Sequence, residues 1–380
     1  TAIVKIPEIK MNDSKKNRLI AEARTLRALY YFNLVRFFGD VPLILDLKTV
    51  EDSKGPRDSK ELIYDQIIED LTFAEEHLPL RSEYSASDEG RINKGAAKIL
   101  FGKVYLTKGD FQKAKDKLAE VVEHESEYGF GLHKDYHANW LRDTEAGIEA
   151  VLYIEYKEPP FQHNGEMALA GPKYSIPGSL GISALNEADI PTQELYDQFD
   201  NRDLRKKTNF KTEFAHLKTG EILKSSIPLS GKFWVEGLET GDRCDVNMHI
   251  IRYADAILMY AEALNEVGES TKALAMLNRI RERAFGDDSG NFKPMSKDEF
   301  RTAILNERRL EFPHEGHRWF DLVRTGTFIQ RMKEHSAYEA KVAEANKTEI
   351  AQNIKEHMIL MPIPQSEIDL NPNLVQNAGY

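Results

Sequence analysis

The residues best suited to chemistry in this sequence are aromatic rings that stand beside amides in its middle third. A sugar ring has an apolar C–H face that packs on Trp or Tyr, while its hydroxyls bond to Asn, Asp, Arg or Gln. The candidate ligand contacts are the rings Trp140, Phe161, Tyr174 and Trp234 and the amides Asn139 and Asn164, with Gln162 and His163 alongside. The pattern favours recognition of a ligand without conversion, although each ring alone also fits a core position.

Metal and cofactor chemistry find little support. A zinc protease needs two histidines four residues apart on a helix, whereas the sequence HEGH at 314–317 spaces them by three and contains a glycine. The acidic stretch from Asp287 resembles a calcium loop but has Phe292 where the sharp turn requires glycine. No glycine-rich phosphate loop or nucleophile motif occurs. We therefore predict no cofactor, no metal and no enzymatic activity.

Acidic residues are numerous, so a glycosidase with paired carboxylates is not excluded by counting. We interpret most of them as surface charges and ion pairs. The stretches read in this way are Glu69, Asp70, Glu75 and Glu76, and the string Glu307, Arg308, Arg309 and Glu311.

Composition narrows the choice of partner and compartment. The chain has 380 residues, a net charge of −11 and one cysteine, Cys244, and it lacks a basic block that could follow a phosphate backbone. Nucleic acid is thus a poor partner. No apolar run reaches the roughly 18 to 20 residues that span a bilayer. The chain opens without methionine and soon enters a helix, so we expect that a preceding segment with any export or lipid signal is missing.

The elements that must position these residues are mainly helices. Apolar side chains recur with a helical period over 15–38, and Gly39 and Pro42 end that helix. A second amphipathic stretch over 61–78 stops at Pro79. The two stretches predict an antiparallel helical hairpin.

An internal repeat predicts two further hairpins. Tyr105, Gly109, Ala114, Leu118 and Val121 align without a gap with Leu264, Gly268, Ala273, Leu277 and Ile280, and Gly102 aligns with Ala261. This is the tetratricopeptide pattern, in which small residues allow two helices to approach and glycine breaks the chain between them.

The region between the repeats has a different character. Strand-like runs at 150–156 and 232–235 stand among glycine, proline and aromatic residues, and 157–186 has no helical period. A loop of that length is usually functional or disordered, and its aromatic content favours a structured surface. Helix returns over 296–326, and the tail after Pro362 is expected to be extended.

Five ordered segments resemble the SusD/RagB family of nutrient-binding outer-membrane lipoproteins. They are EARTLRALYYFNLVRFFGDVPLIL from Glu22, PTQELYDQFDNRDLRK from Pro191, IIRYADAILMYAEALNEVG from Ile250, NERRLEFPHEGHRWFDLVRTG from Asn306, and MPIPQSEIDLNPNLVQNAGY from Met361. The resemblance spans nearly the whole chain.

The resemblance implies a mostly α fold, a single SusD-like domain over 1–380. It would comprise helical hairpins over 15–123, an irregular ligand-binding region over 124–250, hairpins over 251–326 and a C-terminal extension over 327–380. It implies a glycan or oligosaccharide ligand, a SusC-like TonB-dependent transporter as partner, and a surface position on the outer membrane through a lipid anchor outside this sequence.

The resemblance carries over no ligand-binding residue, because the binding aromatics of the family vary in position. Its signature residues are expected to serve the fold through ion pairs and helix packing. They are Arg24, Arg27, Arg318, Trp319 and Asp321. Two alternatives remain, a tetratricopeptide scaffold that binds a protein or peptide, and a glycoside hydrolase.

Overall fold

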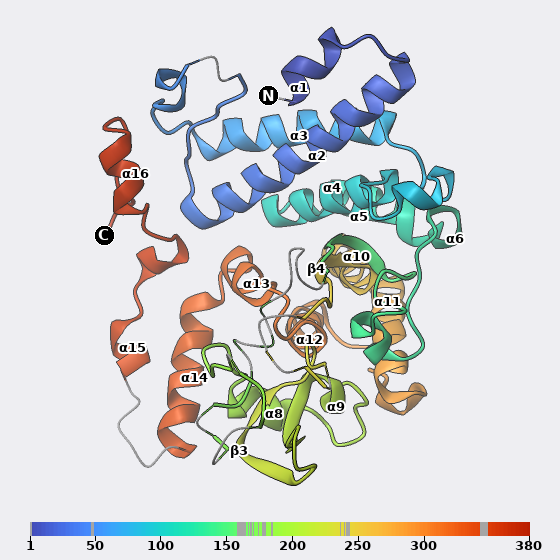
Figure 1. Ribbon diagram of the computed structural model, residues 1–380, viewed down its shortest axis with the longest axis vertical. Helices are drawn as coiled ribbons and strands as arrows, with labels where there is room; N and C mark the ends of the chain where they lie inside the picture. Colours follow the sequence, from blue (N-terminus) through green and yellow to red (C-terminus); the bar gives the residue numbers. More distant parts are fainter. Residues whose placement is uncertain are drawn as a thin grey trace. The chain divides into compact units, whose positions relative to one another are not determined.

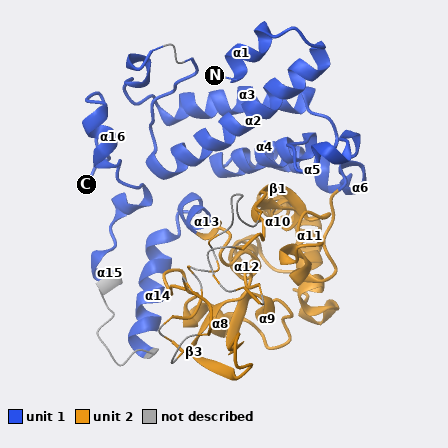
Figure 2. Ribbon diagram, viewed as in Figure 1, with its two compact units in different colours: residues 1–129, 319–380 blue, residues 130–318 orange. Residues whose placement is uncertain are grey.

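The computed structural model describes residues 2–380 except 47–48, 158–164, 166, 168, 170, 174, 177–179, 184, 236, 239, 241–243 and 343–348. Helices dominate, which confirms the predicted fold class (Figure 1). The chain forms two compact units, shown in Figure 2. Unit 1 comprises 1–129 and 319–380, and unit 2 comprises 130–318. Of the predicted regions, 15–123 and 327–380 fall in unit 1, 124–250 falls mainly in unit 2, and 251–326 is divided between them.

Unit 1 begins with two short turns and a long helix. The elements are α1 (Ala2–Lys5), η1 (Ile6–Glu8), α2 (Asp13–Phe38), η2 (Glu51–Ser53), α3 (Lys60–His77), η3 (Arg81–Glu83), η4 (Ala86–Asp88), α4 (Lys94–Lys108), α5 (Phe111–Val122) and α6 (Glu125–Tyr128). The side chain of Asn12 caps α2 by accepting from the backbone of Ser14 and Lys15. Gly39 ends it at a φ of 73°, a conformation that favours glycine. Helices α2 and α3 pack together as predicted.

The C-terminal part of the chain returns to unit 1 at Trp319, the second residue of α13 (Arg318–Arg324). It contains α14 (Phe328–Val342), α15 (Glu349–Asn353), η7 (Glu356–Ile359) and α16 (Gln365–Leu370). The expectation of an extended tail is therefore wrong at α16. This helix starts directly after Pro364, and a proline before a first helical turn is sterically compatible with it.

Unit 2 combines helices with short strands. The elements are η5 (Tyr136–Trp140), β1 (Ala150–Ile154), α8 (Gln193–Gln198), α9 (Lys206–Asn209), β2 (Phe210–Ala215), β3 (Ile222–Ser230), β4 (Met248–Arg252), α10 (Tyr253–Glu266), α11 (Ser270–Phe285), η6 (Asp288–Gly290) and α12 (Lys297–Glu311). Among the described residues, β1 pairs antiparallel with β4, and β2 pairs antiparallel with β3.

One predicted strand is wrong. The run at 232–235 follows the end of β3, and the backbone N–H of Trp234 donates to the carbonyl of Gly231 at 3.2 Å, which closes a turn. A short apolar run does not by itself distinguish a strand from a buried turn.

The two repeat hairpins are confirmed as α4 with α5 and α10 with α11. The aligned alanines, Ala114 and Ala273, are fully buried. The glycines between the helices, Gly109 and Gly268, have φ values of 77° and 89°. The small residues thus lie where two helix backbones approach, as the repeat pattern requires.

Gly102 marks a tighter contact than its counterpart Ala261. A Cβ at Gly102 would lie 2.5 Å from Cγ of Leu118, which is itself fully buried. We predict that Gly102→Val destabilises unit 1 by about 2 to 3 kcal/mol, because the branched side chain forces α4 from α5. Urea unfolding of the variant and the unaltered protein measures this difference in the free energy of unfolding. The double variant Gly102→Val with Leu118→Ala should lose less than the sum of the two single variants, and simple additivity would contradict the proposed contact.

Candidate functional site

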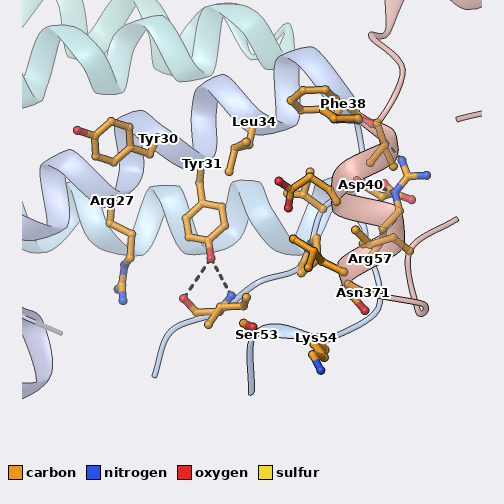
Figure 3. A pocket seen from close by; sticks show the side chains of 18 of the residues that line it. Arg27, Tyr30, Tyr31, Leu34, Phe38, Asp40, Ser53, Lys54, Arg57 and Asn371 are labelled. Atoms are coloured by element: carbon orange, nitrogen blue, oxygen red, sulfur yellow. Dashed lines mark hydrogen bonds between the residues drawn. The ribbon is translucent and has the colours of Figure 1, made fainter. Parts of the chain in front are cut away.

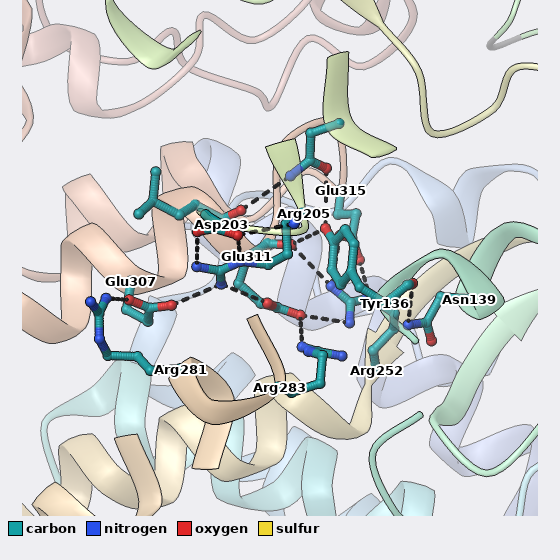
Figure 4. Close-up of polar contacts among 12 residues, drawn as sticks. Tyr136, Asn139, Asp203, Arg205, Arg252, Arg281, Arg283, Glu307, Glu311 and Glu315 are labelled. Atoms are coloured by element: carbon teal, nitrogen blue, oxygen red, sulfur yellow. Dashed lines mark hydrogen bonds and ion pairs between the residues drawn. The ribbon is translucent and has the colours of Figure 1, made fainter. Parts of the chain in front are cut away.

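Unit 2 encloses a network of buried charges centred on Glu311, the last residue of α12 (Figure 4). The carboxylate of Glu311 accepts from Arg205 Nη1 at 2.9 Å, Arg252 Nη1 at 3.0 Å and Arg283 Nη2 at 2.6 Å. Glu311, Arg205 and Arg252 are fully buried. Three guanidinium groups therefore share one carboxylate away from water, a costly arrangement unless further acids balance the charge.

The fold brings the balancing acids from separate segments. Glu149 directly precedes β1 and Arg252 ends β4, so pairing of these strands places the two side chains 2.5 Å apart. Asp203 binds Arg205 through two hydrogen bonds of 3.0 and 2.7 Å. Glu307, one turn before Glu311, lies 2.8 Å from Arg205.

Glu315 and Lys232 extend the network. Glu315 accepts from Arg252 Nε at 2.7 Å and from Lys232 Nζ at 2.5 Å. The linked cations are Arg205, Lys232, Arg252, Arg281 and Arg283, and the linked acids are Glu149, Asp203, Glu307, Glu311 and Glu315. Five positive and five negative charges cancel, which is the condition for keeping ions in a protein interior.

The network shifts the pKa values of its members. Burial by itself raises the pKa of Glu311, but the charges of Arg283, Arg252 and Arg205 outweigh burial and hold this pKa at about 2. Burial lowers the pKa of Lys232 to about 8, against the opposing effect of Glu315. Glu311 is thus ionised throughout the physiological range and serves as the anionic centre.

This pKa predicts a defined acid sensitivity. An ionised Glu311 contributes stability above its ordinary pKa of 4.5, and that contribution is lost as pH falls toward about 2. We expect the difference in unfolding free energy between the protein and its Glu311→Gln variant to shrink over this interval. Urea unfolding at several pH values measures it, and a difference that stays constant from pH 5 to 2.5 contradicts the assignment.

Trp140 covers this network and is not an accessible platform. Its side chain is 3% exposed, and its ring lies 4.5 Å from Lys232 Nζ and 5.3 Å from the guanidinium carbon of Arg252. Asn139 is fully buried and donates to the carbonyl of Tyr136 and to Glu149. A ring this deeply buried presents no face to a ligand, so we assign both residues to the core.

Several carboxylates read as surface charges are also buried. Glu307 and Glu311 lie in the network, and Asp70 in unit 1 is fully buried. Asp70 binds Arg27 through two hydrogen bonds of 2.7 and 2.6 Å. The prediction that Arg27 makes a half-buried ion pair for the fold is confirmed, whereas the surface interpretation of these three acids is wrong.

Trp234 remains the candidate platform among the described residues. It is partly exposed and packs beside the β2–β3 hairpin on a cluster that includes Phe214. The centroid of the Phe214 ring lies 4.6 Å from that of the Trp234 ring, edge-on at an interplanar angle of 61°. Lys211, which the sequence did not single out, places its ammonium group 4.9 Å from the Trp234 ring. Phe161, Tyr174 and Asn164 lie outside the described residues.

The HEGH segment has a structural role. Its Glu315 belongs to the charge network, and His314 Nδ1 lies 3.1 Å from a carboxylate oxygen of Asp189. In the part of the chain that the structure describes, no group of three or more His, Cys, Asp or Glu side chains is arranged to hold a metal ion. No described helix combines the length and hydropathy needed to cross a bilayer.

A groove of about 990 Å³ lies in unit 1 along one face of α2 (Figure 3). Its lining is mainly apolar and includes Leu26, Tyr30 and Leu34, which are 39%, 63% and 39% exposed. Arg57 at its end donates to the carbonyls of Phe38, Asp40 and Val375. Since Arg57 is committed to the backbone, the groove suits apolar surface better than a hydroxyl-rich ligand.

Comparison with protein families matches two parts of the chain. The model of the SusD family matches residues 229–380. A second model, described as starch-binding associating with outer membrane, matches residues 3–106.

Individual relatives extend the match to almost the whole chain. SusD-like protein P2 of Formosa agariphila is 30% identical over 97% of this chain and 75% of its own length. Starch-binding protein SusD of Bacteroides thetaiotaomicron is 24% identical, over 97% of this chain and 74% of its own length.

Solved structures share the fold. A SusD superfamily protein from Parabacteroides distasonis is 28% identical, with a TM-score of 0.83 over 100% of this chain and 82% of that one. A laminarin-binding SusD-like protein is also 28% identical, with a TM-score of 0.80 and the same coverage. The second of these structures is named for laminarin binding and the Bacteroides relative for starch binding, neither for a reaction, in keeping with the prediction that this chain is not an enzyme. The sequence match over nearly its full length, together with the shared helical fold, shows that the chain belongs to the SusD family.

Proposed function

We propose that this protein binds a glycan at the bacterial outer membrane and passes it to a SusC-like TonB-dependent transporter. The observation that carries the proposal is the match of the whole chain to a laminarin-binding SusD-like protein at 28% identity. The relative named for starch binding supports the same class of ligand. A lipid anchor outside these 380 residues would hold the protein at the membrane surface.

Within the chain, we propose Trp234 as a glycan contact. The ring is partly exposed, stands on the apolar cluster of unit 2, and is held from the side by Phe214. A ring fixed in this way loses little conformational entropy when a sugar packs on it. Phe161, Tyr174 and Asn164 remain proposed contacts from the same irregular region.

Calorimetry against a panel of oligosaccharides tests the proposal. We expect at least one ligand, and Trp234→Ala should weaken its binding by about tenfold or more, the effect of a central aromatic contact. The matched control is Tyr30→Ala, which removes an exposed ring from unit 1 and should leave the affinity unchanged. If the unaltered protein binds no oligosaccharide of the panel, the proposal of glycan binding is contradicted.

A pull-down of the full-length lipoprotein from membranes tests the proposed partner. We expect a TonB-dependent transporter to be recovered with it.

A further inference from the structure

Trp234 lies in a short turn, residues 231–234, whose side chains have very different surroundings. The side chain of Lys232 enters the charge network, where its Nζ donates to the carboxylate of Glu315 at 2.5 Å. Phe233 is buried in one apolar cluster of unit 2, and Trp234 packs on another. The position of the Trp234 ring therefore depends on how the two residues before it are held.

Lys232 is fixed at the far end of its side chain. This side chain is fully buried, and the ammonium group that donates to Glu315 also lies 4.5 Å from the ring of Trp140. Glu315 is fixed in its turn, because Arg252 donates to both of its carboxylate oxygens at 2.7 and 2.9 Å. Arg252 ends β4, so the ion pair links the turn to a strand of the unit.

The backbone holds the start of the same turn. The N–H of Gly231 donates to the carbonyl of Asn209 at 3.0 Å, and the N–H of Trp234 donates to the carbonyl of Gly231 at 3.2 Å. A Cβ at Gly231 would lie 2.5 Å from the carbonyl oxygen of Thr208, so the turn packs directly on the backbone of α9. With one residue fixed by its backbone and the next by its side chain, the turn has little freedom to rotate.

The burial of Lys232 is better explained by geometry than by stability. Removing an ammonium group from water is costly, and an apolar side chain of similar size often serves the interior as well. Apolar burial has no preferred direction, whereas a hydrogen bond from an ammonium group to a carboxylate sets both a distance and a direction. The ion pair with Glu315 therefore restricts the position of the turn more than an apolar contact would.

We propose that Lys232 is a positioning residue for the binding surface, because its ion pair with Glu315 fixes the 231–234 turn and holds the ring of Trp234 in the orientation that a sugar contacts. The inference rests on the proposed function, since it concerns the surface named there. Lys232 is fully buried and acts through Trp234 rather than on the ligand. A ring that is already in position lowers the entropic cost of binding.

Fluorine NMR of the full chain labelled with fluorotryptophan tests the position of the ring without a ligand. The chain has three tryptophans, and the signal that disappears in Trp234→Phe identifies Trp234. In Lys232→Met we expect the Trp234 signal to shift or broaden, while the signal of Trp319 in unit 1 stays unchanged. Calorimetry with an oligosaccharide that binds the unaltered protein should show an affinity about tenfold weaker.

Arg281→Met is the matched control, because it also removes one cation from the charge network. Arg281 lies on α11 and pairs with Glu307 at 2.7 Å, whereas Lys232 pairs with Glu315. The control should leave the Trp234 signal and the affinity unchanged even where it lowers stability. Equal effects of Arg281→Met and Lys232→Met would trace the change to lost charge balance and overturn the inference.

A second variant serves if Lys232→Met does not fold. Lys232→Met combined with Glu315→Gln removes one cation and one acid, so the network stays balanced while the ion pair is lost. In the variant that folds, an unchanged Trp234 signal, or an unchanged affinity despite a shifted signal, overturns the inference and leaves glycan binding intact. If the unaltered protein binds no oligosaccharide, the proposed function fails first and the role of Lys232 in binding fails with it.

Discussion

Replacing Glu311 by alanine is expected to destabilise unit 2 by about 3 to 5 kcal/mol, the usual cost of removing one partner from a buried ion pair. The carboxylate accepts from Arg205, Arg252 and Arg283, and Arg205 and Arg252 are fully buried. Without it, the network keeps five cations but only four acids, and its buried position shields the excess charge from bulk water. The loss of unfolding free energy should exceed the loss caused by truncating a buried apolar side chain of similar size.

Urea unfolding gives the free energy, and hydrogen exchange of α12 assigns the loss to unit 2. The control is Asp200→Asn, because Asp200 and Arg202 form an ion pair on the surface of the same unit, with side chains 41% and 63% exposed. Its removal should have little effect, since water replaces the lost partner. Equal effects of the two substitutions would show that the network does not stabilise the unit.

The second large effect is expected from Asp70→Ala in unit 1. Asp70 lies on α3 and is fully buried, and both of its oxygens accept from Arg27 on α2. Its removal leaves Arg27, whose side chain is 17% exposed, without its two-point partner at the helix seam. We expect a loss of about 2 to 4 kcal/mol, somewhat less than at Glu311 because water still reaches the guanidinium group.

Glu69→Ala provides the matched control for Asp70→Ala. Glu69 is the preceding residue on the same helix and contacts Arg24 at 3.4 Å, but its side chain is 65% exposed. The two substitutions remove acids of similar type from adjacent positions. A difference between their losses of unfolding free energy therefore measures the effect of burying the acid. Comparable melting curves for the two variants would indicate that the Arg27 pair is not a determinant of the α2–α3 contact.

Local sequence signals were sufficient to predict the positions of the main helices. The helix over 15–38 appears as α2, bounded by Asn12 and Gly39, because capping and apolar periodicity act over a few neighbouring residues. The repeat alignment also located both hairpins from a local signal. Ala114 and Ala273 are small residues at the position of the repeat where two helices pack closely, and both are buried. The β2–β3 hairpin was missed, because its inner face is covered by distant segments rather than marked by a local period.

The candidate site depended on contacts that no local pattern encodes. Trp140 and Trp234 look equivalent in the sequence, yet the first lies over Lys232 and Arg252 and the second remains partly exposed. Lys211 is one of many lysines until the hairpin places it beside Trp234. The burial of a ring and its contacts depend on which segments, distant in the sequence, pack together in the folded protein.

By itself, the sequence determined the helical class, the repeat hairpins and the family, because these depend on periodicity, capping and ordered motifs within the chain. Only the tertiary structure decided that Asp70, Glu307 and Glu311 are interior charges and that Trp140 belongs to the core. A carboxylate on a helix has the same sequence signature whether water or an arginine from a distant segment solvates it, so its environment is settled only when those segments meet.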